Sequence, residues 1–547
     1  MTVTRAEHVA LSGMATLVAG VTLPYLTDLA GFGIWPLVNA VAATLVGCAI
    51  AAGLRHLIAP GRRDVWLLPV VVLSAAAYLL WIAWPSLLPP GGGPDLTHHL
   101  MLIEYVERQS SLVHHPEAHG LLGEMADYPP GLHLLAVLAA TLTRSSGFFA
   151  VYPVLVLAVA LKAGIFVLIL LRVLEHHPQR AILALCGVAL LVYAPAYTLH
   201  SFTHDSFLAQ VLSELFAIAM WWALVAWWQG PSRGAALALG VAGAAVFLTW
   251  PMWIGPPVLA FVVTIMLRHD VAIAARGRQL VLGLGPIVVV AALHTFGRTA
   301  ALQILGTSGA VVTPSPALLG WWLPALAAAG LAMAVRDQRH HPLGIFAAAI
   351  ALQAGALWFI ATRRGADTPY MAIKMTYLAI YPMIAAAVLC VSRFAGRRSI
   401  AWLVLALIAV ASARGTPSDS LESRIVSRDL WHAGRWARAR FAPRCVDYLV
   451  ANAGTAYWLH LAVLGNPRAS ERSTNNDTFD TQRAFERWLT DSGPPYAIAN
   501  LDVIPVEIRA RTRVLHLEGT AAILERVTAT PVAAGETCAV SRPTVAP

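Results

Sequence analysis

The strongest constraint on the fold is a pattern that recurs along the whole chain, in which apolar runs alternate with short polar segments. A helix crosses a bilayer with roughly 20 consecutive apolar residues. Of the 547 residues, 58% are hydrophobic and 12% are charged, whereas about a quarter are charged in an ordinary soluble domain. The pattern predicts a polytopic α-helical membrane protein. We expect about thirteen spans, which start near residues 9, 34, 65, 148, 181, 207, 234, 252, 279, 317, 343, 371 and 400.

Clusters of basic residues divide the predicted loops into two kinds that alternate along the chain. Segments such as 55–63, 172–180 and 268–278 are basic, whereas the loops between them have few clustered charges. The positive-inside rule places the basic loops and the N-terminus in the cytoplasm, and an odd number of spans places the C-terminal end outside. Because these clusters account for the net charge of +9, we expect membrane lipids and no nucleic acid as partners. Arg363 and Arg364 break the rule on the outer side.

The segment 85–130 is the longest predicted loop between spans, and it is rich in acidic residues and histidines. A plain connector needs only a few residues, so a long polar loop with many titratable groups indicates function. We therefore divide the chain into two N-terminal helices at 1–64, a catalytic membrane core at 65–413, and a soluble domain at 414–547. High alanine, arginine and glycine usage points to a bacterium with a GC-rich genome, and so to the bacterial inner membrane.

The C-terminal segment 414–547 is predicted to be a small extracytoplasmic α/β domain, because its charge rises and its apolar runs shorten to strand length. Strands are expected at 455–465, 496–503, 513–517 and 521–527, and an amphipathic helix at 478–491. Cys445 and Cys538 flank this domain, and they can pair if it faces an oxidising compartment. The sequence alone leaves that pairing open.

The first candidate motif follows three glycines and contains Asp95, His98 and His99. On a helix that starts at Asp95, the two histidines fall at the third and fourth positions beyond it and share its face. The simpler interpretation of Asp95 is a helix cap, and the two roles are compatible.

The second motif runs from Asp127 through Tyr128 and two prolines to His133. The prolines impose an extended turn, and the apolar segment after them, 132–143, is too short to span a bilayer and suits the outer interface. One interpretation is a plain turn, and the other is a rigid elbow that holds Asp127 and His133 near Asp95.

The third motif contains His204 and Asp205, at the predicted outer end of one span and the start of the next. Asp205 is either a helix cap or a functional acid, since charged groups close to the membrane are costly and often functional. Glu214, about two turns farther along, is an ionisable residue at membrane depth.

The fourth motif combines Arg363 and Arg364 with Tyr370 and Lys374. Lys374 is expected about one turn inside the outer face, where snorkelling to the interface is the simpler explanation. Guanidinium forks and a lysine point charge also suit a phosphodiester. Because the arginine pair is otherwise unexplained on the outer side, we favour a phosphate site.

These motifs together resemble the GT-C superfamily of membrane glycosyltransferases, over roughly residues 65 to 413. Asp95 matches the acid that opens the first outer loop in the protein O-mannosyltransferases and the lipid A aminoarabinose transferase. The Tyr128-Pro129-Pro130-Gly131 motif is more similar to that of the actinobacterial arabinofuranosyltransferases. In the aminoarabinose transferase a lysine stands where this chain has Tyr128, and the two spans before residue 65 are an addition to the usual pattern.

The resemblance implies transfer of a sugar from a polyprenyl-phosphate donor to a glycan, lipid or protein acceptor, with inversion, on the extracytoplasmic face. Asp95 is then the expected base, and Asp127 and Asp205 are further catalytic candidates. Lys374, Arg363 and Arg364 are expected to bind the donor phosphate. The expected acceptor-binding or supporting residues are His98, His99, Tyr128, His133, His204 and Tyr370. A divalent metal ion is a minority hypothesis, with Asp95, His99, Asp127 and His204 as candidate ligands.

Other functions remain open at the level of sequence. A transporter or flippase of a lipid-linked substrate would also have many spans, and Glu214 is the residue that favours it. Against it, the acids concentrate on outer loops and no internal repeat is visible. A glycan polymerase or ligase usually has its large outer loop late in the chain, whereas here it is early. A scaffold that has lost catalysis is a further alternative, although all three aspartates are present.

Overall fold

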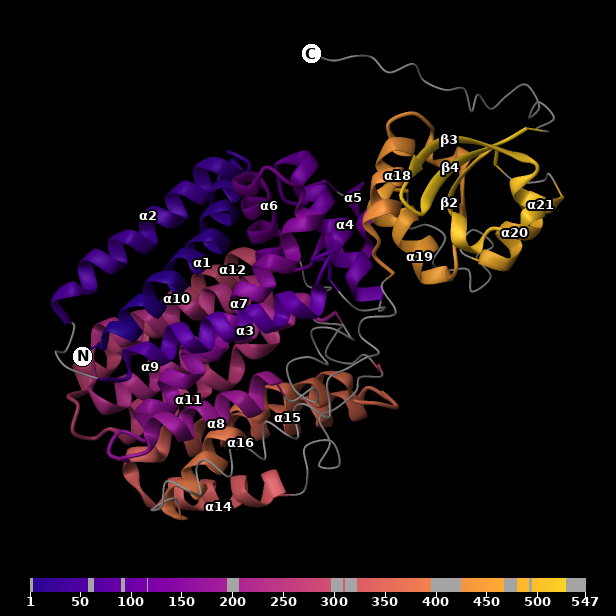
Figure 1. The fold of residues 1–547 in the computed structure, drawn as a ribbon. Helices are drawn as coiled ribbons and strands as arrows, with labels where there is room; N and C mark the ends of the chain where they lie inside the picture. The colour runs from indigo at the N-terminus through magenta and orange to yellow at the C-terminus, as the bar shows by residue number, and fades with distance from the viewer. Residues whose placement is uncertain are drawn as a thin grey trace.

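A computed structural model describes residues 3–57, 63–89, 94–115, 117–193, 206–296, 308–309, 322–394, 425–466, 480–490 and 494–527. It consists of a large helical bundle and, beyond one end of the bundle, a smaller unit built around a β-sheet (Figure 1). The described residues therefore agree with the predicted helical membrane protein that carries a small α/β unit at its C-terminal end.

A helix lies at each of the first twelve predicted span positions, and the thirteenth, near residue 400, lies outside the described residues. Seven of these helices are long and apolar enough to cross a membrane, namely α1, α2, α7, α9, α12, α15 and α16. The exact number of spans stays a prediction. The twelve helices are α1 (Arg5–Leu29), α2 (Pro36–Leu54), α3 (Leu67–Ala83), α7 (Gly147–Val173), α8 (Arg180–Tyr193), α9 (Leu208–Gln229), α10 (Arg233–Thr249), α11 (Gly255–Leu267), α12 (Ile273–Thr295), α14 (Trp322–Arg336), α15 (His341–Arg363) and α16 (Tyr370–Phe394).

The centre of the bundle is formed by α7, α9 and α16. The apolar part of α9 is buried along its whole length and that of α7 almost completely, whereas α2, α12 and α15 bury only about a quarter of theirs. These peripheral helices expose large apolar side chains, such as Leu352 and Trp358 of α15, as lipid-facing helices do. Close packing of α14 on α16 depends on Gly330, because a Cβ atom there would lie 1.8 Å from the Ala386 carbonyl oxygen.

The predicted outer loop is largely helical in the structure. It contains α4 (Pro94–Gln109), α5 (Ala118–Leu122) and a short 3₁₀ turn η3 (Gly123–Ala126), and α6 (Gly131–Thr143) follows it directly. The expected helix near Asp95 is confirmed, with Asp95 in its first turn. The segment after the prolines is also confirmed as a short helix. Figure 1 shows α4, α5 and α6 at the end of the bundle that faces the sheet.

The C-terminal unit has a four-stranded sheet with the order β1-β2-β4-β3. Strand β1 is parallel to β2, and both contacts of β4 are antiparallel. The predictions near 496–503, 513–517, 521–527 and 478–491 are confirmed as β2, β3, β4 and α20. The elements are α18 (Arg428–Arg438), β1 (Val446–Leu449), α19 (Ala453–Trp458), α20 (Thr481–Leu489), β2 (Tyr496–Asn500), α21 (Val506–Arg509), β3 (Thr512–Glu518) and β4 (Ala521–Arg526).

The strand predicted at 455–465 is wrong, because this segment is helical. It forms the end of α19 and a π-helical turn, η10 (Leu459–Val463). The Asn452 side chain accepts a hydrogen bond from the Thr455 backbone N–H and so caps the helix. The periodicity of a short apolar run does not distinguish a buried helix from a buried strand. The strand β1 was missed because it has only four residues.

The C-terminal unit is attached to α4 and α7 by polar and aromatic contacts. The Glu104 carboxylate of α4 accepts hydrogen bonds from Arg435 at 2.5 Å and from Arg438 at 3.0 Å. Phe148 of α7 stacks on Trp431, with 5.1 Å between the ring centroids. These contacts place α18 and α19 beside the outer-loop helices (Figure 1).

Cys445 is disulfide-bonded, whereas Cys48, Cys186 and Cys390 are free. The predicted partner of Cys445, Cys538, lies outside the described residues, so this pairing stays a prediction. The free cysteines lie in the membrane bundle, as expected for small apolar residues.

Candidate functional site

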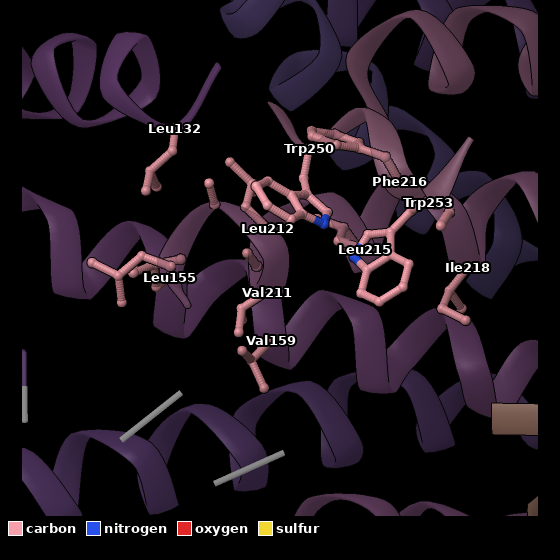
Figure 2. Close-up of a cluster of buried hydrophobic side chains, with 14 of the residues drawn as sticks. Leu132, Leu155, Val159, Val211, Leu212, Leu215, Phe216, Ile218, Trp250 and Trp253 are labelled. Atoms are coloured by element: carbon pink, nitrogen blue, oxygen red, sulfur yellow. The ribbon is translucent and has the colours of Figure 1, made fainter. Parts of the chain in front are cut away.

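The candidate site lies where α4, α6, α10 and α16 meet at the end of the bundle nearest the sheet. Buried apolar side chains of α7 and α9 form a dense cluster around Trp250, one of the residues of the site (Figure 2). Leu155 and Val159 come from α7, Leu212 and Phe216 from α9, and Trp250 from the end of α10. This packing fixes the helices that carry the polar residues, so the site is built on a rigid scaffold.

Asp95 and Tyr128 lie close enough to interact electrostatically, whereas the elbow interpretation named Asp127 and His133 as the neighbours of Asp95, which stays a prediction. Tyr128 lies in the turn before α6, and both the Asp95 carboxylate and Tyr370 are close enough to act on it electrostatically. Desolvation, followed by these two groups, raises the pKa of Tyr128 well above its usual value. The Tyr128 phenol therefore keeps its proton and can donate a hydrogen bond throughout the physiological pH range.

His99 and His133 form a buried pair. The Nδ1 atom of His99 lies 3.1 Å from Nε2 of His133, and Tyr128 packs edge-on against both rings. Desolvation, then the charges of His133, His98 and Lys374, lowers the pKa of His99 well below its usual value. His99 is therefore a neutral imidazole at neutral pH, which brings no positive charge of its own to the site.

Lys374 is buried one turn into α16, and three aromatic rings surround its ammonium group. The Nζ atom lies 3.7 Å from the ring centroid of Phe207, 4.5 Å from that of Tyr370 and 5.0 Å from that of Trp250. The faces of aromatic rings attract a cation electrostatically. Only 4% of Lys374 is exposed to solvent, so the simpler hypothesis of snorkelling does not describe it.

Asp127, Arg363 and Arg364, which the sequence also predicted as site residues, lie at the rim of the candidate site or outside it. Asp127 is 3.7 Å from Nε2 of His119, and both side chains are partly exposed. Arg363 and Arg364 are exposed, and the Arg363 guanidinium lies over the ring of Phe359 at 5.1 Å.

His98 connects the site to the C-terminal unit. Its Nε2 atom lies 3.2 Å from the Tyr457 hydroxyl of α19, and its Nδ1 atom lies 3.4 Å from a carboxylate oxygen of Glu124. Because His98 directly precedes His99, this contact brings α19 to the edge of the site.

Two predicted residues, His204 and Asp205, lie outside the described residues. The expected metal set includes His204 and therefore stays a prediction. In the described part of the chain, no group of three or more histidine, cysteine or acidic side chains is arranged to hold a metal ion, so the donors described there do not fit a metal site.

Glu214 forms a buried ion pair with Lys162 of α7, with 2.6 Å between the charged atoms. The same carboxylate oxygen accepts a hydrogen bond of 2.8 Å from the hydroxyl group of Tyr381 in α16. These contacts connect α7, α9 and α16 two turns below the candidate site. They provide a structural explanation for an ionisable residue at membrane depth.

Sequence reasoning missed Phe207 and Trp250 as neighbours of Lys374. They come from two different loops, and nothing in a single sequence indicates that those loops meet. The contact of Tyr457 with His98 was not predicted either. For Phe207 and Trp250, the available signal was that each of these aromatic residues lies at the start or end of a predicted span.

No known protein-family profile matches the chain, and no curated protein matches it. It is similar to solved structures of the oligosaccharyltransferase from Archaeoglobus fulgidus. The apo crystal structure is 13% identical, with a TM-score of 0.48, over 80% of this chain and 70% of that one. The structure of AglB from the same organism, in complex with an inhibitory peptide and a dolichol-phosphate, is 14% identical, with a TM-score of 0.45, over 80% and 69%. At these values the similarity carries no argument about superfamily or activity, so the function has to be inferred from the side chains of the site.

Proposed function

We propose that this protein is a glycosyltransferase that takes a sugar from a polyprenyl-phosphate donor. The acceptor is a cell-envelope glycan, lipid or protein on the extracytoplasmic face of a bacterial inner membrane. The observation that carries the proposal is the buried ammonium group of Lys374, which lies near His99, at the same end of the bundle as the Asp95 carboxylate.

The reaction is a single displacement at the anomeric carbon. The acceptor hydroxyl oxygen bonds to that carbon while the bond from the carbon to the phosphate oxygen breaks. The bonding electron pair leaves with the phosphate, and the acceptor proton passes to the Asp95 carboxylate. One displacement inverts the configuration of the anomeric carbon.

Lys374 would stabilise the negative charge that grows on the departing phosphate. Stabilisation of this kind is strong where water is excluded and the charged group is held in place beforehand. The rings of Phe207, Trp250 and Tyr370 provide both conditions. The exposed Arg363 and Arg364 would meet the phosphate from the rim.

The neutral His99–His133 pair and the protonated Tyr128 would orient the acceptor by hydrogen bonds, with Tyr128 next to Asp95. Asp127 and Asp205 remain further catalytic candidates. In this arrangement the membrane core at 65–413 carries the reaction. The domain at 414–547 helps to seat the acceptor, since Tyr457 contacts His98.

The alternative function, a transporter or flippase, depends on Glu214. The ion pair of Glu214 with Lys162 gives this acid a structural role, which favours the transferase.

The deciding experiment is sugar transfer by the purified protein in lipid, with a panel of polyprenyl-phosphate sugars. Asp95→Asn would be compared with Glu117→Gln, which removes an exposed carboxylate from the same outer loop. We expect one donor to be consumed, with turnover retained in Glu117→Gln and reduced on the order of 10²- to 10⁴-fold in Asp95→Asn. Equal turnover in both variants would show that Asp95 is not the base and would leave Asp127 and Asp205 as the candidates. If the wild type consumes no donor, the transferase proposal fails.

A further inference from the structure

A second cavity lies at the opposite end of the bundle from the candidate site. Tyr370 and Lys374 lie in the first turns of α16, whereas Arg393 is in the last turn of this 25-residue helix, on the order of 30 Å away. The cavity has a volume of about 1170 Å³. It is formed by the loops after α7, α9, α11 and α14 together with the end of α16.

The lining of this cavity is predominantly basic, with four arginines and five histidines against three carboxylates. Two of the arginines are already engaged. Arg268 forms a bidentate pair with Asp270, and Arg172 is hydrogen-bonded to Glu7 and Gln229. These contacts hold two walls of the cavity in place and compensate their charges.

The other two arginines, Arg339 and Arg393, are exposed, and neither forms an ion pair with a described residue. Both act electrostatically on His340, as does His341. The nearby carboxylate of Asp337 is only 3.6 Å from His340. Both arginines thus line the cavity near His340. Neither forms an ion pair with a described residue, although the Asp337 carboxylate accepts a hydrogen bond from the Arg339 backbone N–H.

We propose that this cavity binds a phosphate-bearing anion, with Arg339 and Arg393 as its principal ligands. The lining has more basic than acidic side chains, and a concave surface with an excess of one charge concentrates ions of the opposite sign. Guanidinium groups match phosphate oxygens in a bidentate manner. The volume is slightly above the range usual for small-molecule sites, which is sufficient for a lipid headgroup. The inference is independent of the proposed transfer reaction because the two sites share no residue.

The phosphate group has two possible sources, an anionic lipid at the adjoining membrane surface or a free phosphate. Both would be tested on the purified full-length protein in neutral detergent. Native mass spectrometry would measure retention of phosphatidylglycerol against phosphatidylcholine. A thermal-shift titration would measure binding of inorganic phosphate. Selective saturable lipid retention alone identifies a headgroup site, and saturable binding of phosphate identifies a site for the free ion.

The variant Arg339→Gln/Arg393→Gln would be compared with Arg233→Gln. Arg233 is an exposed arginine at the start of α10, at the same end of the bundle, and it does not line the cavity. We expect the affinity for the bound probe to fall at least about tenfold in the double variant and to stay within about twofold in the control. Equal affinity in the two variants, or no saturable binding of either probe to the wild type, overturns the proposal. If the double variant does not fold, Arg339→Gln alone replaces it, with the same control and an expected loss of at least about threefold.

Discussion

The Nδ1 atom of His99 and the Nε2 atom of His133 lie 3.1 Å apart in the interior of the candidate site. One nitrogen must accept and the other donate, so the pair is hydrogen-bonded only while at least one ring is neutral. Burial of both rings therefore couples the protonation of the site to its packing.

Acid should destabilise the protein through His99. Its pKa in the folded protein lies well below the ordinary value of 6.5, so the unfolded chain binds the proton more readily between these two pKa values. The stabilising contribution is complete above pH 6.5 and is lost as the pH falls below it. We expect the melting temperature to fall between pH 7 and pH 5, and to fall less steeply in His99→Gln. The matched control is His119→Gln, which changes a half-exposed histidine of the same loop. If His99→Gln follows the wild-type slope, the coupling is absent.

Replacement of Lys374 should reduce the rate of transfer. Lys374→Met keeps the packing against Phe207 and Tyr370 but removes the charge, and we expect the kcat for the consumed donor to fall by on the order of 10²- to 10³-fold. Lys374→Arg should restore only part of the loss, because the planar guanidinium group does not fit a cage built for a point charge. Single-turnover kinetics with the identified donor would measure both variants. A wild-type rate in Lys374→Met would show that Lys374 does not act on the donor phosphate.

The buried pair of Lys162 and Glu214 should behave as a structural unit. Lys162→Met leaves an uncompensated carboxylate inside the bundle, which costs about 3–5 kcal/mol of stability. The double variant Lys162→Met/Glu214→Leu removes both charges and should recover most of that loss. Thermal unfolding in detergent would compare the stabilities of the wild type, Lys162→Met and the double variant. A double variant that is less stable than Lys162→Met would contradict this interpretation, and a selective effect on substrate transport would revive the transporter alternative.

The contact between His98 and Tyr457 should affect use of the acceptor. Tyr457→Phe removes one hydroxyl group and its hydrogen bond, worth about 0.5–1.5 kcal/mol, so we expect the acceptor KM to rise by roughly 2- to 12-fold while the donor KM is unchanged. Tyr496→Phe, in β2 of the same unit, is the matched control. Deletion of residues 425–547 should act in the same direction with a larger effect. Unchanged transfer kinetics in the truncated protein would exclude a role of this unit in acceptor binding.

The positions of the helices along the chain were largely predictable, because the cost of exposed backbone and charge in a bilayer dictates long apolar runs. The same holds for the face of α4, since the spacing of Asp95, His98 and His99 is a local property of the helix. The strand predicted at 455–465 failed because a short apolar run is compatible with both structures, and here packing on α4 and α18 selects the helix.

The aromatic surroundings of Lys374 could not be predicted. Phe207 and Trp250 are far from Lys374 in the sequence, and only the packing of α9, α10 and α16 brings their rings to one ammonium group. The arginines of the second cavity are a similar case. As a sequence they indicate only membrane topology, whereas Arg339 and Arg393 line one cavity because α14 packs on α16.

The sequence by itself determined the membrane class of this protein, most of its helices and the acids and histidines of the first outer loop. These features follow from hydropathy and from local helical geometry, which act over a few residues. The tertiary structure decided which polar groups meet, namely the His99–His133 pair, the Lys374 cage and the contact of Tyr457 with His98. Such contacts depend on the packing of whole helices against each other, and the energies that determine this packing are spread over many residues distant in the sequence.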